Sequence, residues 1–182
     1  MQRIGKPISS VDEDELIKKH ESSVGEILSS QPGISQTSFG PGASRPVIRG
    51  QSRERVRVLE NGLENGDVSA TSDDHAVTTD PLTTQRIDVL RGPSTLMFGG
   101  QAIGGVVNVI DDSIAEQAVG EDFTGRLNVI VGDSASDEFA GSTVLKGQAD
   151  NLNWYFSGFS RSTNDIDTVS YTHLTLPTIC SV

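Results

Sequence analysis

The chain has 182 residues, a formal net charge of −11 and a single cysteine. This length suits one domain, or one domain and part of a second. The acidic balance argues against a nucleic-acid partner, which would require a basic face, and one cysteine excludes an internal disulfide framework.

Two short capped helices are predicted near the start of the chain. Ser10 and Glu13 have the spacing of a capping box, with acidic residues in the first turn and lysines in the last. Ser23 and Glu26 repeat that spacing ahead of an apolar i, i+3, i+4 stripe, which a Pro-Gly pair ends. Residues 35–43 are rich in Ser and Gly without periodicity, so a loop is predicted there.

Four short strands are predicted in the next part of the chain, from their apolar runs and period-2 alternation. They cover residues 46–50, 55–60, 87–90 and 106–110. Asn61-Gly62 predicts a tight turn after the second strand. Residues 66–79 are polar and are predicted to form a long loop with no clear element.

A glycine-rich block separates the last two of these strands. Gly92-Pro93 stops the first, and a turn bounded by Gly99 and by Gly104-Gly105 leads into the second. A dinucleotide or phosphate loop would instead open a helix, and a P-loop would end in Gly-Lys-Ser/Thr. We therefore predict that these glycines serve positive φ angles and close backbone approach, and we predict no phosphate site.

After about residue 120 the pattern changes to three long alternating strands, over residues 124–131, 139–148 and 152–160. Strands of about ten residues joined by polar turns are typical of a transmembrane β-barrel. Three strands cannot close a barrel, and their open edges would be costly in lipid, so an incomplete barrel is predicted. The final stretch fits neither part, and Cys180 and His173 within it are assigned no function.

Three segments resemble the plug domain of TonB-dependent outer-membrane receptors: VIRG at 47–50, RVRVLENG at 55–62 and LRGPSTLMFG at 90–99. With the glycine block, the resemblance covers roughly residues 4–115. It implies an α+β plug domain, a small mixed β-sheet with short helices, followed by antiparallel β-strands of an incomplete outer-membrane β-barrel. The expected divisions are a plug at 1–115, the start of the barrel at 116–168 and a tail of doubtful origin at 169–182.

Two arginines, Arg49 and Arg91, stand at predicted strand ends next to glycine. From the residues alone, a solvated arginine is an equally good interpretation, because long charged side chains are ordinarily exposed. The resemblance implies that both pair with carboxylates on the inner barrel wall and hold the plug there. A guanidinium suits that task because it forms directional, bidentate pairs with carboxylates.

The cluster Asp73-Asp74-His75 lies in the predicted polar loop. A zinc site needs about four ligands and this cluster offers two or three, so a solvated loop is the simpler interpretation. Residues 66–81 resemble the corresponding loop of zinc-uptake receptors in the family. That resemblance implies Asp74 and His75 as ligands, Asp73 as a nearby charge, and zinc as transported ligand, with no certain cofactor. Related loops also occur in receptors with other substrates, so a siderophore or haem cargo stays open.

No nucleophile, base and acid stand together in a catalytic pattern, so no catalytic residue is predicted and an enzyme ranks last. The resemblance implies a receptor in the cell outer membrane whose partners are its own barrel, its ligand and TonB, with no nucleic acid. Neither an export signal nor a TonB-binding segment is visible before Ile4, so we expect a fragment of a longer protein. The alternative is a soluble periplasmic module with a plug-like fold, whose strands from residue 121 would bury one face.

Overall fold

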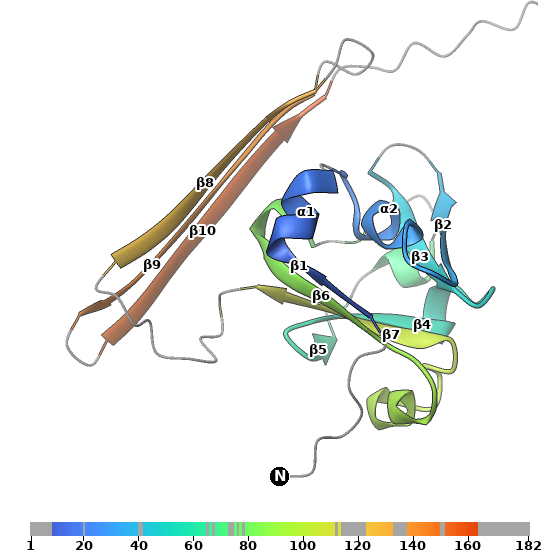
Figure 1. The fold of residues 1–182 in the computed structure, drawn as a ribbon. Coiled ribbons are helices and arrows are strands. Elements are labelled where there is room, and N and C mark those ends of the chain that lie inside the picture. The colour runs from blue at the N-terminus through green and yellow to red at the C-terminus, as the bar shows by residue number, and fades with distance from the viewer. Residues whose placement is uncertain are drawn as a thin grey trace, which may run out of the picture.

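The computed structural model describes residues 9–19, 21–39, 42–64, 66, 68–72, 75, 77, 79–111, 113, 123–132, 138–149 and 152–163. These residues form a five-stranded, a three-stranded and a two-stranded sheet. The three-stranded sheet lies to one side of the other two sheets, and two short helices cover one face of the five-stranded sheet (Figure 1). Within the described residues, no helix has both the length and the apolar character needed to cross a membrane.

The five-stranded sheet has the order β1-β6-β7-β4-β5 and is mixed, because β4 and β7 are parallel while the other neighbours are antiparallel. The strands are β1 (Ser9–Asp12), β4 (Val56–Glu60), β5 (Leu63–Glu64), β6 (Thr84–Leu90) and β7 (Gly105–Asp111). The predicted turn at Asn61-Gly62 is confirmed: both residues have positive φ, 51° and 81°, and they join β4 to β5.

The helices are α1 (Glu13–Lys19) and α2 (Val24–Ser29), and the two-stranded sheet joins β2 (Ile34–Ser38) to β3 (Ser44–Ile48). The capping box at Ser23 is confirmed. Its hydroxyl accepts from the Glu26 N–H at 3.3 Å, and the Glu26 carboxylate accepts from the Ser23 N–H at 3.1 Å.

Two predictions in this region are wrong. Ser10 caps no helix, because it lies in β1 and its hydroxyl donates to Asp88 of β6 at 2.9 Å. The neighbouring Val11 is fully buried, and its burial on the sheet outweighs a local capping signal. The predicted loop at 35–43 contains most of β2. The polar residues of β2 pair with β3, and β3 is buried at four of its five positions.

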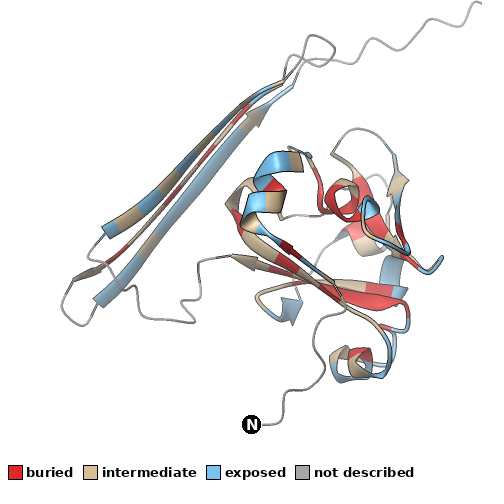
Figure 2. Cartoon of the chain, viewed as in Figure 1, coloured by how far each residue is buried: buried red, intermediate tan, exposed pale blue. Residues whose placement is uncertain are grey.

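The hydrophobic core lies between α1, α2 and the five-stranded sheet, where burial is most continuous (Figure 2). Its fully buried side chains include Ile27 and Leu28 of α2, Ile48 of β3 and Ile87 of β6. Within the described residues, four 3-10 turns connect the strands: η1 (Arg53–Arg55), η2 (Val68–Ala70), η3 (Pro81–Thr83) and η4 (Pro93–Phe98). The described part of the polar loop predicted at 66–79 therefore contains a regular turn, η2.

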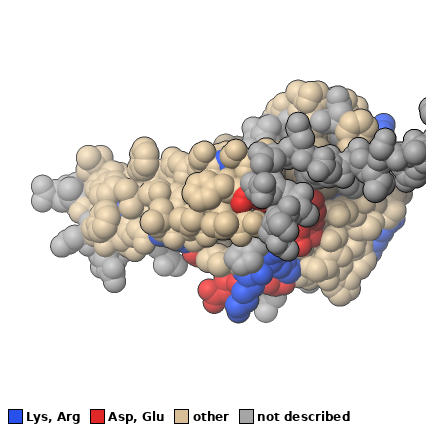
Figure 3. Space-filling view, turned by 90° about the horizontal axis from the view of Figure 1, so that it is seen from above, with Lys and Arg blue, Asp and Glu red and all other residues tan. Residues whose placement is uncertain are grey.

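The three predicted long strands are confirmed as β8 (Phe123–Val131), β9 (Phe139–Ala149) and β10 (Leu152–Ser162), in the antiparallel order β10-β9-β8. Exposure alternates along β8, with Leu127 72% and Val131 75% exposed on the outward face. Phe123 and Trp154 meet on that face, with ring centroids 5.9 Å apart. Seen from above, uncharged side chains cover this sheet, and charged ones gather nearer the helices (Figure 3).

Candidate functional site

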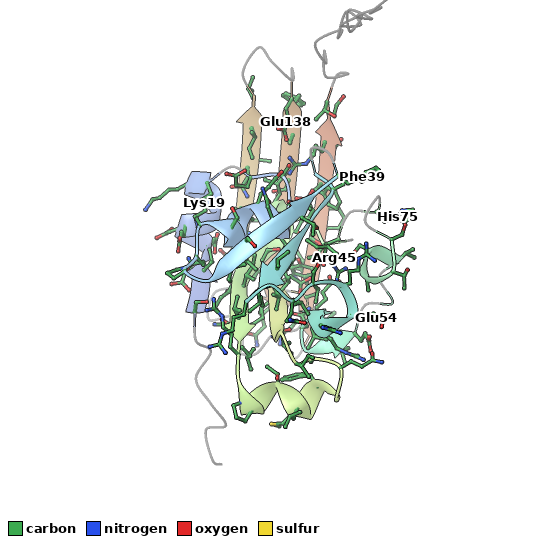
Figure 4. The ribbon with its side chains drawn as sticks, turned by 90° about the vertical axis from the view of Figure 1, so that its right-hand side faces the viewer. Lys19, Phe39, Arg45, Glu54, His75 and Glu138 are labelled. Atoms are coloured by element: carbon green, nitrogen blue, oxygen red, sulfur yellow. The ribbon has the colours of Figure 1, made fainter. Side chains whose placement is uncertain are left out.

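The candidate ligand loop runs from η2 to η3, and only part of it is described. Asp73 and Asp74 lie outside the described residues, whereas His75 is exposed, and its N–H donates to the Ser72 carbonyl oxygen at 3.4 Å. His75 stands at the outer edge of the molecule, while Arg45 lies in its interior (Figure 4). The imidazole is thus accessible, as a ligand for an external ion would need to be.

The start of this loop is tied to the sheets by a buried arginine. Arg45 of β3 is 3% exposed, and its guanidinium donates to the hydroxyl of Ser69 in η2 and, at 3.3 Å, to the Val56 carbonyl oxygen. Ser69 itself is fully buried. The N–H groups of Thr71 and Ser72 then close the turn on the Val68 carbonyl oxygen at 3.0 and 3.1 Å. The start of the loop, from Val68 to Ser72, is therefore fixed by side-chain and backbone bonds.

Among the described residues, no three His, Cys, Asp or Glu side chains come close enough together to hold a metal ion. Two of the three residues proposed as the metal cluster are outside that set, so the zinc assignment to Asp73, Asp74 and His75 stays a prediction. A complete zinc site would in any case require ligands beyond these three.

The structure brings Arg49 and Arg91 together, although they follow strands in different sheets. Arg49 has a φ of 52° and its N–H donates to the Gly33 carbonyl oxygen at 3.2 Å. Gly33 also lies beneath Arg91, whose Nη1 is 3.4 Å from the position a Cβ would occupy. Burial, and then the charge of Arg49, lower the pKa of Arg91.

Neither guanidinium has a carboxylate partner among the residues that the structure describes. The Arg91 Nε is buried and makes no hydrogen bond there. Two neighbouring cations repel each other, and a partly buried one is costly unless it is paired. This pair of arginines is therefore a site suited to one or two carboxylates from another part of a protein.

The glycine block is structural, as the order of its elements predicts. Gly92 and Gly99 have φ of 86° and 107° and flank η4, which Pro93 begins. Gly104 and Gly105 lead into β7 where the backbone meets Ile48, Gln51 and Val56 too closely for a side chain. This part of the chain thus fixes how β7 enters the sheet beside β4.

A crevice of about 420 Å³ separates the ends of β4 and β7 from β10. Three carboxylates line it, those of Glu60, Asp80 and Asp111, opposite Ser157 and Phe159. Burial, and then the charge of Asp111, raise the pKa of Glu60 above its ordinary value of 4.5. The negative charge of Glu60 therefore opposes folding at neutral pH.

We expect Glu60→Gln to raise the stability of the chain at pH 7 and to lose this advantage as the pH falls towards 4.5. A raised carboxyl pKa means that the folded state holds the proton more tightly than the unfolded one. The contribution of Glu60 is then fully present below about pH 4.5 and is lost as the pH rises through the raised pKa. Urea denaturation midpoints of Glu60→Gln and of the unchanged chain at pH 7 and pH 4 measure this difference in stability, with Glu54→Gln at an exposed position as control. If Glu60→Gln shifts the midpoint equally at both pH values, the pKa of Glu60 is not raised by folding.

Sequence reasoning missed several residues that position the site. Arg45 left no clear signal, because it directly precedes the strand predicted at 46–50 and its partner Ser69 is 24 residues away. Arg126 and Arg161, on the inward face of β8 and β10, could have been found from the period-2 alternation that predicted those strands. Their partners could not, because these lie far away in the sequence: Glu13 for Arg126 and Asp80 for Arg161.

A small mixed sheet with short helices, joined to long antiparallel strands whose outward face is apolar, is the fold of a receptor plug with the first strands of its barrel. The family model described as TonB-dependent Receptor Plug Domain matches residues 1–106. The chain belongs to this family.

Known proteins agree with this assignment. The chain is 34% identical over 121 residues to the vitamin B12 transporter BtuB of Photobacterium profundum, which covers 63% of this chain and 20% of that protein. It is 30% identical over 104 residues to the hemin receptor of Yersinia enterocolitica, covering 56% and 15% respectively. The chain thus spans a fifth or less of the length of these relatives.

The fold also matches solved structures. A mutant of the ferric enterobactin receptor from Pseudomonas aeruginosa superposes with a TM-score of 0.71 at 23% identity, over 87% of this chain and 25% of that one. The expected fold class is confirmed: a plug with a mixed sheet and few helices, followed by antiparallel strands that resemble the start of a barrel, which these strands do not close. The division at 115/116 stays a prediction, because residues 114–122 lie outside the described set.

Proposed function

We propose that this chain forms the plug and the first barrel strands of an outer-membrane receptor that imports a scarce nutrient, with TonB supplying the energy. The observation that carries the proposal is the plug-family match over residues 1–106. In this proposal Arg49 and Arg91 pair with carboxylates on the inner wall of the barrel and hold the plug in place.

The three long strands support a membrane location over a soluble periplasmic module. Their outward face exposes large apolar side chains: Phe123, Leu127, Val129, Val131, Phe139, Leu152, Trp154 and Phe156. A soluble protein rarely leaves so large a contiguous apolar surface in water, whereas a barrel turns such a face to lipid. The plug-facing side is more polar and carries Arg126, Asn128 and Ser142.

Zinc is the cargo that we propose. His75 is exposed, the loop that contains it begins at η2, where Arg45 bonds to Ser69, and two aspartates precede His75 in the sequence. Imidazole and carboxylate are both good ligands for Zn²⁺, and the remaining ligands would come from the barrel. The second candidate is haem or a siderophore, which the similarity to a hemin receptor and to a ferric enterobactin receptor favours.

The test is uptake of radioactive zinc by cells that make the receptor and are starved of the metal. We expect uptake that requires TonB, and we expect His75→Ala to weaken zinc affinity by at least about tenfold, since disturbing even the outer shell of a metal site costs that much. His20→Ala serves as the matched control, because it removes the same side chain from a position far outside the loop in sequence.

The two parts of the proposal fail separately. Zinc uptake that is no greater with the receptor than without it would remove zinc as the cargo and leave the receptor standing, whereas unchanged zinc affinity in His75→Ala would remove His75 as a ligand. Zinc uptake that continues at the same rate without TonB would contradict the energy-coupled receptor itself. Uptake of hemin or a ferric siderophore in place of zinc would select the second candidate.

A further inference from the structure

We propose that the turn formed by Asp80, Pro81 and Leu82 is the site at which the three-stranded sheet of β8, β9 and β10, here called the wall, holds the plug. This turn is called the seat, and Arg161 and Ser142 are its positioning residues. This seat is separate from the Arg49–Arg91 pair and does not depend on which cargo the receptor carries. All three wall strands reach it through side-chain contacts, directly or through one intermediate residue.

Asp80 serves two purposes at once. Its Oδ1 accepts from the Leu82 N–H at 2.8 Å and so caps η3, while its Oδ2 lies 3.6 Å from the Arg161 Nε of β10. Arg161 is also bonded to Glu138, just before β9. The side chains of Asp80 and Arg161 are only 10% and 18% exposed, so solvent screens this pair weakly.

Ser142 of β9 makes the second contact with the same turn. Its hydroxyl donates to the Leu82 carbonyl oxygen at 2.9 Å, and Asn128 of β8 donates to that hydroxyl oxygen at 3.2 Å. Leu82 is thus held through both its N–H, by Asp80, and its carbonyl group, by Ser142. A backbone unit fixed at both polar groups by partners from two parts of the fold has little freedom to shift.

A third contact, between Arg126 of β8 and Glu13 of α1, lies beside the seat. Glu21, Leu16 and Ile17 of the helical region, η3 and β8 together line a cavity of about 230 Å³ there. The charges are complementary in both ion pairs, with the cation on the wall and the carboxylate on the plug. This pattern gives the plug one orientation relative to the wall.

The place of the seat along the chain gives it a consequence for transport. The residues before it form the candidate ligand loop with His75, and the residues after it form β6, which ends at Leu90, directly before Arg91. Because η3 is fixed between the ligand loop and β6, a movement of the loop caused by a ligand is resisted at η3 before that movement reaches β6. The seat therefore separates the ligand loop from the arginine pair mechanically.

Hydrogen exchange of backbone amides in the purified receptor in detergent micelles tests the seat. Arg161→Met is expected to speed exchange at Leu82, Thr83 and Thr84 several-fold, the effect of losing an ion pair at 3.6 Å that is not a hydrogen bond. Asp80→Asn is expected to act likewise through loss of charge, because its amide oxygen can still cap η3. Arg86→Met is the matched control, since Arg86 pairs with Asp88 inside the plug sheet, at 3.2 Å.

The conservative variant Arg161→Lys separates positioning from general destabilisation. We expect it to bring exchange at η3 back towards the wild-type rate, because it keeps a cation near Asp80 and leaves the bond from the Leu82 N–H to Asp80 in place, whereas Arg161→Met raises the rate. Ser142→Ala should add a further increase that Arg161→Lys does not repair. Exchange at η3 that is unchanged in Arg161→Met, or that rises equally in Arg86→Met, would overturn the proposal. So would Arg161→Lys and Arg161→Met variants that exchange at the same raised rate.

Discussion

Replacing Gly104 with valine is expected to destabilise the plug by roughly 1–3 kcal/mol or more, the usual cost of forcing extra atoms into a packed interior. A Cβ at this position would lie 2.6 Å from the Gln51 Cβ, 2.9 Å from the Arg55 carbonyl oxygen and 3.0 Å from the Val56 Cγ2. The backbone cannot simply move away, because the Gly104 N–H donates to that same Arg55 oxygen at 2.9 Å. The glycine is required by close approach.

Gly100→Val is the matched control for this prediction. It places the same side chain in the same glycine block, yet no described atom lies within 4 Å of the Cβ position of Gly100. Urea unfolding of the two variants, followed by circular dichroism, should show a lower midpoint for Gly104→Val and a nearly unchanged one for Gly100→Val. If both variants lose the same stability, the packing around Gly104 is not the cause.

Local chemistry was enough to predict elements that depend on near neighbours. The Ser23–Glu26 box and the Asn61-Gly62 turn each follow from a few adjacent residues, and the structure has both. The long strands were also predictable, because alternation over about ten residues is a signal that no helix produces. Arg49 and Arg91 were selected for the same local reason, a charged residue at a strand end beside glycine.

Tertiary pairing decided what the sequence could not. Ser10 has the residue spacing of a helix cap, but its segment forms the edge strand of the main sheet and pairs with β6. Its hydrogen-bond partner there, Asp88, is 78 residues further along the chain. The same holds for β2. Its polar composition predicts a loop, but its backbone pairs with β3 and forms a strand. Such long-range partners leave no local trace, so β1, β2 and the seat at η3 were beyond prediction.

The candidate site divides in the same way. Sequence and resemblance selected His75 and the two arginines, but nothing local shows that Arg45 fastens the His75 loop or that Arg49 comes to lie beside Arg91. The proximity of the two arginines matters most, because it changes what each one does to stability. Two cations side by side oppose folding unless a carboxylate from elsewhere joins them.

Arg91→Met is therefore expected to have opposite effects in two measurements. In this chain by itself, the free energy of unfolding should rise or stay the same, since the substitution removes a partly buried cation that the charge of Arg49 repels. In the receptor, zinc uptake should fall by about tenfold or more, because a wall carboxylate would lose its directional partner, and charged hydrogen bonds are worth about 1.5–3 kcal/mol. Methionine is chosen because it keeps an unbranched apolar side chain in place of the aliphatic stem of Arg91.

Arg55→Met distinguishes this effect from the loss of any arginine. Arg55 is exposed and its guanidinium bonds to Gln51 within the same segment, so neither stability nor uptake should change by much when it is replaced. The opposing result in Arg91→Met, more stable and less active, is what a residue retained for function produces. Should Arg91→Met lower stability as well as uptake, the arginine would be a structural residue of the plug. Should Arg91→Met raise stability and leave uptake intact, Arg91 would not be a residue that holds the plug against the barrel wall.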